Sequence, residues 1–138
     1  MMSESELFAT ILKVATDENV ILMEQFGKGI FFMPELAFAY LCGKSIMKNQ
    51  TAIFGNIEYH WVREKEYKNY GIADMLFEVM DDSPEIMIEF KMDIPSYKYL
   101  ADIEKLRRLD GNFKNISVVL RKHSAIRLRF HNKIVYKI

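Results

Sequence analysis

The chain has 138 residues, half of them hydrophobic, and its 19 basic and 19 acidic residues give a net charge of zero. This length and composition predict a single domain, residues 1–138, that folds alone. The only cysteine, Cys42, excludes an intrachain disulfide framework and a four-cysteine zinc site, and it favours a reducing, cytoplasmic location.

The beginning of the chain does not resemble a targeting segment. The sequence MMSESELFAT has no basic region ahead of an apolar core, which a secretory signal needs. The longest apolar stretch, residues 29–43, is interrupted by Pro34 and Glu35 and is too short to span a bilayer. We therefore expect no membrane partner.

Two helices are expected before residue 30. Ser3 and Glu6 have the spacing of a capping box ahead of an apolar periodic stretch, which predicts that a helix begins there. Asp17 can cap a second helix over residues 18–26, and Gly27 is a stop signal for that helix.

The pattern then passes from helix to strand. Pro34 suits the first position of a third helix over residues 34–47. After residue 56 the period changes: residues 57–66 alternate loosely, two apolar runs of strand length follow, and the cluster at residues 80–84 between these runs reads as a turn. Three consecutive strands are expected, over residues 57–66, 71–79 and 85–92.

The last third of the chain completes an α/β pattern. Residues 96–111 return to helical spacing and predict a crossover helix that ends at Gly111. A further strand is expected over residues 115–121, and residues 126–138 predict a hairpin that turns near residues 131–133. The predicted order is helices, three strands, a crossover helix and further strands.

Charged residues interrupt the second and third expected strands. The period of two places Glu89 and Lys91 on one face of the third strand, while Phe90 belongs to the other. Asp74 interrupts one face of the second strand. If these strands form a hairpin around residues 80–84, Asp74 lies level with Glu89, and two carboxylates and one ammonium come together.

Such a cluster has two interpretations. Charges withdrawn from water need partners or a metal ion, and Mg²⁺ is typically held by one or two carboxylates together with water and substrate phosphate. Lys91 could then orient or deprotonate an attacking water, or stabilise the negative charge that develops on the phosphate. The alternative is a structural ion pair between Asp74 and Lys91.

The spacing of these residues resembles a known family. Asp74, followed fifteen positions later by the triplet EFK at residues 89–91, is similar to the motif of the PD-(D/E)XK nuclease superfamily, the restriction-endonuclease-like fold. The resemblance covers residues 34–121, and Ala73 stands where the family name has proline. It implies a core of one helix, three strands, a crossover helix and a strand, here with extra N-terminal helices and a C-terminal hairpin.

The resemblance also implies roles for individual residues. Asp74, Glu89 and the backbone carbonyl of Phe90 would bind Mg²⁺ or Mn²⁺. Lys91 would act on the attacking water, and Glu35, in the first core helix, would assist.

Charge is unevenly distributed along the chain. Residues 1–90 hold 7 Lys/Arg and 15 Asp/Glu, whereas residues 91–138 hold 12 and 4. This asymmetry indicates a polyanion partner, and a solvated basic face is the other interpretation. The candidates for phosphate contacts are Lys98, Lys105 and Arg108 on the crossover helix, and Arg127 and Arg129 on the hairpin.

These features predict a metal-dependent endonuclease that hydrolyses phosphodiester bonds in DNA by in-line attack of an activated water. A branched-DNA or junction substrate, a restriction or mobile-element role, and a homodimer or a partner protein that supplies DNA specificity all stay open. The alternative is a catalytically silent domain of the same fold that acts as an interaction or structural module. The presence of Asp74, Glu89 and Lys91 speaks against that alternative.

Overall fold

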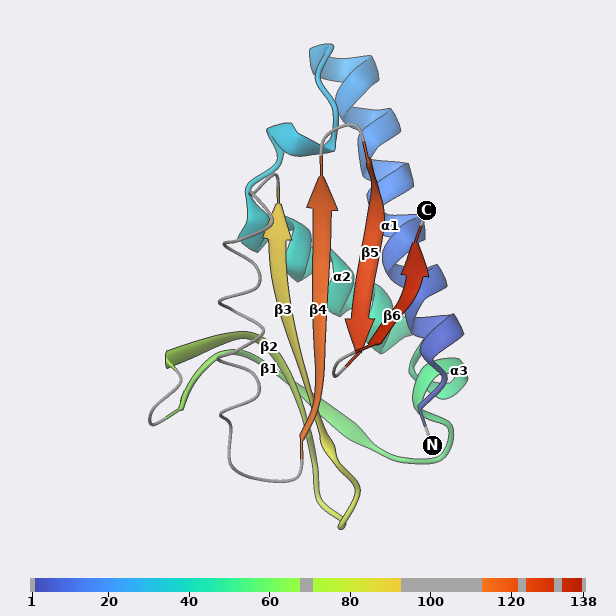
Figure 1. The fold of residues 1–138 in the computed structure, drawn as a ribbon, viewed down its shortest axis with the longest axis vertical. Coiled ribbons are helices and arrows are strands. Elements are labelled where there is room, and N and C mark those ends of the chain that lie inside the picture. The colour runs from blue at the N-terminus through green and yellow to red at the C-terminus, as the bar shows by residue number, and fades with distance from the viewer. Residues whose placement is uncertain (1, 68–70, 93–112, 122–123, 131–132, 138) are drawn as a thin grey trace. The chain divides into compact units, whose positions relative to one another are not determined.

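The chain forms two compact units of different character. The first, Met1–Ile57, is helical, and the second, Glu58–Ile138, carries a six-stranded sheet (Figure 1). The computed structural model describes residues 2–67, 71–92, 113–121, 124–130 and 133–137. Helices and a mixed sheet confirm the predicted α/β class. The single-domain expectation stays a prediction.

The first helix, α1 (Glu4–Phe26), is longer than the sequence predicted. It begins at the expected place, because the N–H of Glu6 donates to Oγ of Ser3 at 3.3 Å. The prediction that Asp17 caps a second helix was wrong, since α1 continues through it. Asp17 lies 2.7 Å from Nζ of Lys13, one turn earlier, and an i,i+4 ion pair of this kind suits a helix interior.

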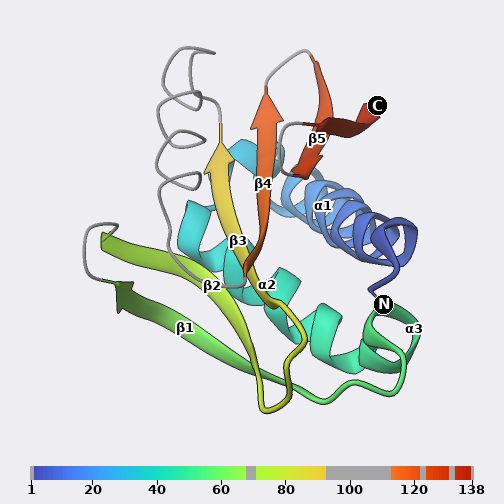
Figure 2. The same cartoon turned by 60° about the horizontal axis from the view of Figure 1, so that its bottom comes forward.

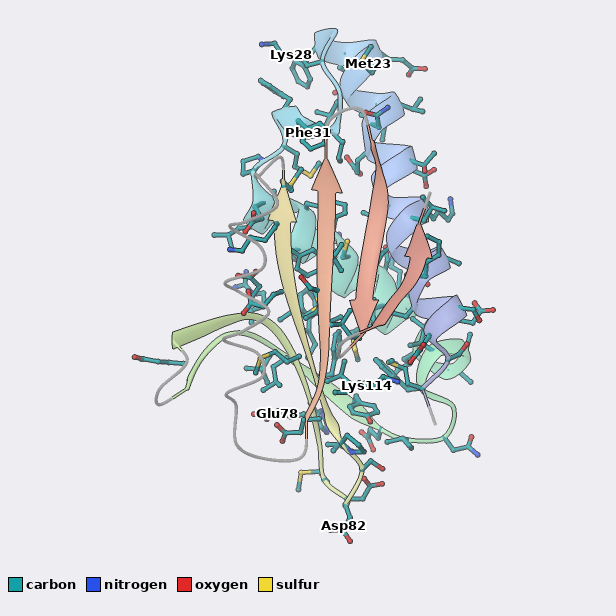
Figure 3. The ribbon with its side chains drawn as sticks, in the orientation of Figure 1. Met23, Lys28, Phe31, Glu78, Asp82 and Lys114 are labelled. Atoms are coloured by element: carbon teal, nitrogen blue, oxygen red, sulfur yellow. The ribbon has the colours of Figure 1, made fainter. Side chains whose placement is uncertain are left out.

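The end of α1 agrees with the prediction. Gly27 has a φ of 66°, in the left-handed region that glycine adopts without steric penalty, and its N–H donates to the carbonyl of Met23. Figure 3 shows Met23 on the last turns of α1.

A side chain of α1 holds the short 3₁₀ helix η1 (Ile30–Phe32) that follows. The Oδ1 atom of Asn19 accepts the N–H of Ile30 at 2.8 Å. A Cβ atom on Gly29 would lie only 2.7 Å from this oxygen, closer than real Cβ contacts. A larger residue at this position would therefore push the Asn19 side chain away from Ile30.

We expect Gly29→Ala to lower the free energy of unfolding by about 1 to 3 kcal/mol, because the added methyl group displaces Asn19 and leaves the N–H of Ile30 without its acceptor. Denaturant titration measures the change. Gln25→Ala, at an exposed position of α1, is the control and should shift the free energy by less than about 0.5 kcal/mol. Equal stability of Gly29→Ala and the parent protein would contradict the constraint.

Two further helices complete the first unit. Helix α2 (Glu35–Lys48) begins one residue later than expected, with Pro34 as its N-cap. The five-residue α3 (Gln50–Phe54) was not predicted, because it is too short to show a period. The N–H of Ser3 donates to the carbonyl of Ile53 at 2.7 Å and so joins α3 to the beginning of α1.

The core of the first unit comes from apolar residues at helical spacing: Leu7, Ile11, Phe38, Cys42, Ile46, Ile53 and Phe54. Burial raises the pKa of the Cys42 thiol far above its ordinary range. Because the thiolate is the reactive form, Cys42 is not a candidate nucleophile or metal ligand. No helix in the described residues combines the length and the apolar character that a membrane span needs.

The six strands of the second unit lie in chain order across the sheet. They are β1 (Tyr59–Tyr67), β2 (Gly71–Val79), β3 (Glu85–Met92), β4 (Phe113–Arg121), β5 (Ser124–Phe130) and β6 (Lys133–Lys137). Neighbouring strands are antiparallel except β3 and β4, which are parallel. Parallel neighbours need a crossover connection. The helix predicted for it, over residues 96–111, lies outside the described residues.

The turn between β2 and β3 is the one that the sequence predicted. Oδ1 of Asp81 accepts the N–H of Ser83 at 2.8 Å, and hydrogen bonding to Ser83 lowers the pKa of the Asp81 carboxyl. The Tyr59 hydroxyl donates to the carbonyl of Pro84 at 2.9 Å, and burial, together with the charge of Asp81, raises the pKa of Tyr59. Figure 3 shows Asp82 at the tip of this turn.

Candidate metal site

The two central strands of the sheet separate partway along their length. Strand β2 pairs with β1 from end to end, but among the described residues its ladder with β3 covers only residues 75–77 of β2. Beyond that ladder, residues 89–92 of β3 are paired with β4. Figures 1 and 2 both show β1 and β2 turning to one side while β3 and β4 continue side by side. We call the place where β2 leaves β3, at Asp74 and Glu89, the fork.

Asp74 lies at the fork. The last pair of the β2–β3 ladder is Met75 with Ile88, so Asp74 and Glu89 are the next positions in the same register. The N–H of Phe90 donates to Oδ2 of Asp74 at 2.9 Å. The carboxylate thus takes the place of the backbone carbonyl that would accept this N–H if the ladder continued.

The register also determines which residues share a face. Residues directly opposite each other in an antiparallel ladder share one face, and residues two apart along a strand share it too. Leu76 and Met87 are such a pair, and Asp74, Glu89 and Lys91 continue their face. The structure therefore brings Asp74 to the strand segment that carries the glutamate and the lysine.

The Phe90 carbonyl belongs to the same place. In an antiparallel ladder the N–H and the C=O of one residue point to the same neighbouring strand. Because the N–H of Phe90 points to Asp74, its carbonyl oxygen also lies on the β2 side of β3. Asp74, Glu89 and this carbonyl are all hard oxygen donors, the kind that Mg²⁺ binds.

Burial differs among the charged residues at the fork. Glu89 is buried, with 6% of its surface exposed, whereas Asp74 and Lys91 are half-buried. A carboxylate withdrawn from water is unfavourable unless hydrogen bonds or opposite charge compensate it. A metal ion bound beside Asp74 and Lys91, which are half-buried, can keep some of its water ligands.

Ser117 on β4 was missed by the sequence reasoning. It pairs with Glu89 in the parallel ladder and is only 2% exposed. Its Oγ atom has no hydrogen-bond partner in the part of the chain that the structure describes. Nothing in the strand sequence FKNISVVLR singles out this serine, because only its register with Glu89 places it beside the fork.

Two of the predicted DNA-binding residues occupy positions in line with the fork. Backbone pairing across β3, β4 and β5 gives two rows of paired positions. The first row consists of Glu89, Ser117 and Arg129, and the second consists of Lys91, Val119 and Arg127. The positions of Arg127 and Arg129 are thus two strands away from the charged residues of β3.

The other predicted site residues are not placed at the fork. Glu35 is the first residue of α2 and lies in the first unit, so its predicted role beside Asp74 and Glu89 stays a prediction. The remaining DNA-binding candidates lie outside the described residues and also stay predictions: Lys98, Lys105 and Arg108.

The donor set at the fork suits magnesium. Within the described ranges, no group of three or more His, Cys, Asp or Glu side chains could hold a metal ion. The fork offers two carboxylates and one carbonyl, which leaves the remaining positions of an octahedral ion to water or substrate, as Mg²⁺ prefers. A structural zinc site would instead need four protein ligands, usually sulfur or nitrogen.

No protein-family model, no curated protein and no solved structure matches this chain. The case for a function therefore depends on the residues at the fork.

Proposed function

We propose that this protein is a metal-dependent nuclease with a restriction-endonuclease-like core of the PD-(D/E)XK type, and that it hydrolyses phosphodiester bonds in DNA. The observation that carries the proposal is the hydrogen bond between Asp74 and the backbone of Phe90, beside the buried Glu89. It joins the aspartate on one strand to the EFK triplet on the next. The order of α2 and β1 to β4 supports this core.

Each residue at the fork has a role in the proposed reaction. Asp74, Glu89 and the Phe90 carbonyl would hold Mg²⁺ or Mn²⁺, which when bound supplies positive charge that polarises the phosphate and activates a water. The N–H of Phe90 orients the Asp74 carboxylate. Lys91 orients the water for in-line attack on phosphorus, or stabilises the charge that develops as the P–O bond to the leaving oxygen breaks.

The positive charge of the last third of the sequence supports a nucleic-acid substrate. Affinity for DNA comes largely from neutralised phosphates, and residues 91–138 hold 12 Lys/Arg against 4 Asp/Glu. Arg127 and Arg129 occupy positions in the same rows as Lys91 and Glu89. These basic residues would hold the DNA backbone while the acidic residues of the fork hold the ion.

We expect the protein to cleave DNA in Mg²⁺ or Mn²⁺ and to be inactive in EDTA. Glu89→Gln should lower the cleavage rate by about 100-fold or more, because a neutral amide is a weaker ligand for a hard cation. Gel assays on supercoiled plasmid, a four-way junction, a flap and a single strand would measure cleavage and identify the preferred substrate. Glu24→Gln, the same change at an exposed position of α1, is the control and should leave cleavage unchanged.

One result would contradict the proposal. If the parent protein cleaves none of these DNA substrates and neither ion raises its melting temperature, the fork holds no metal. A catalytically silent module of the same fold would then be the better description.

A further inference from the structure

We infer that Ser117 is a positioning residue of the metal site, and that its hydroxyl donates a hydrogen bond to a water molecule bound to the ion. The inference rests on the proposed function, because it requires an ion between Asp74 and Glu89. It adds a residue from a third strand, β4, to a site otherwise built from β2 and β3.

The Ser117 hydroxyl is buried and has no partner among the described residues. The residue is 2% exposed, and no hydrogen-bond partner for Oγ is present in the described residues. Buried hydroxyls are normally bonded, since an unmade hydrogen bond destabilises the fold. The hydroxyl of Thr10 shows the usual arrangement, because it donates to the carbonyl of Glu6 at 2.8 Å and accepts from Nδ2 of Asn49 at 3.1 Å.

The position of Ser117 relative to Glu89 also supports this role. Ser117 is paired with Glu89 on the adjacent strand, and neighbouring strands lie about 4.8 Å apart. Paired residues of a parallel ladder share one face, so the hydroxyl lies on the face of the carboxylates and Lys91. Because Oγ is not bonded to Glu89, its proton is available to a third atom held between them. A water carried in by the ion would be such an atom, since Mg²⁺ keeps several waters when it is bound by few carboxylates.

The chemistry of second-sphere residues gives the expected size of the effect. Groups that hydrogen-bond the ligands of a metal ion orient those ligands, and their loss typically weakens metal binding on the order of 10-fold. Ser117→Ala removes the donor and leaves the carboxylates in place. The variant should therefore bind Mn²⁺ with the same stoichiometry as the parent but about 10-fold more weakly.

The test compares metal affinity with stability in the absence of metal. Titration calorimetry with MnCl₂ alone measures affinity, and thermal melts in EDTA measure stability. We expect Ser117→Ala to melt in EDTA at or above the temperature of the parent, because it removes an unpaired buried hydroxyl. Thr10→Val, which removes a buried hydroxyl that has partners, is the matched control and should melt lower while binding Mn²⁺ normally.

Two outcomes would overturn the inference, and they differ in what they say about the proposed function. If Glu89→Gln loses Mn²⁺ binding while Ser117→Ala keeps full affinity, Ser117 is structural and the metal site stands. If the parent binds no Mn²⁺, the proposed function fails and this inference fails with it. Ser117→Cys, which fills the same space with a weak donor, should also bind Mn²⁺ more weakly and replaces the alanine variant if that variant does not fold.

Discussion

Lys91→Met should lower the rate of DNA cleavage in Mg²⁺ by about 100-fold to 10,000-fold, the usual range for loss of a group that acts in proton transfer or charge stabilisation. The methionine keeps an unbranched apolar stem at this half-buried position and removes the charged ammonium group with its N–H donors. Mn²⁺ binding should persist, because Asp74 and Glu89 remain. Cleavage assays and calorimetry on the same purified variant measure the two effects.

The same variant tests whether Lys91 acts in catalysis or only forms a structural ion pair. If Lys91 only neutralises Asp74 or Glu89, its removal leaves an uncompensated charge, and the free energy of unfolding should fall by about 3 to 5 kcal/mol, as for a broken buried pair. A large fall in melting temperature, together with a parent protein that cleaves no DNA, would favour the ion pair. Lys48→Ala, at an exposed position of α2, is the control and should change neither property.

Asp74→Asn and Asp74→Ala should both abolish Mn²⁺ binding but differ in stability. Asparagine retains a side-chain oxygen that can accept the N–H of Phe90, whereas alanine leaves that N–H without its acceptor beside a fully buried residue. The alanine variant should therefore lose about 1 to 3 kcal/mol of unfolding free energy, and the asparagine variant less than half as much. Denaturant titrations in EDTA compare the two.

Two results would argue against the two roles of Asp74, as a metal ligand and as the acceptor of the Phe90 N–H. Equal stability of the two variants would mean that the hydrogen bond to Phe90 does not hold the fork together. Full cleavage activity of Asp74→Asn would mean that the carboxylate charge is not needed and that the ion, if any, is held elsewhere.

The helical part of the fold shows which helix boundaries local sequence patterns predict correctly and which they do not. Ser3 and Gly27 were correctly predicted as the two ends of helical structure, because each satisfies backbone groups that a helix end leaves open. Asp17 was misread as an internal boundary. Aspartate prefers the N-cap position, but it is tolerated inside a helix when a lysine lies one turn away. Lys13 lies one turn before Asp17 and forms an ion pair with it.

The strands at the site were predictable because their signals are local. The bounds of β2 and β3 coincide with the predicted ranges, since apolar runs flank a turn cluster that Asp81 and Ser83 close with a hydrogen bond. A short hairpin turn determines the register of its two strands. The alignment of Asp74 with the segment after Ile88 therefore follows from the sequence alone.

What the tertiary structure decided is where the strands separate and what lies on the far side of β3. The pairing of Ser117 with Glu89 joins residues 28 positions apart across a parallel connection, and no local pattern determines the register of such a pair. The bond from Phe90 to Asp74 likewise exists because β2 leaves β3 at that residue. The sequence by itself determined which charged residues are candidates for the chemistry, because residue type and short-range spacing are local, while the packing of distant strands decided which atoms meet.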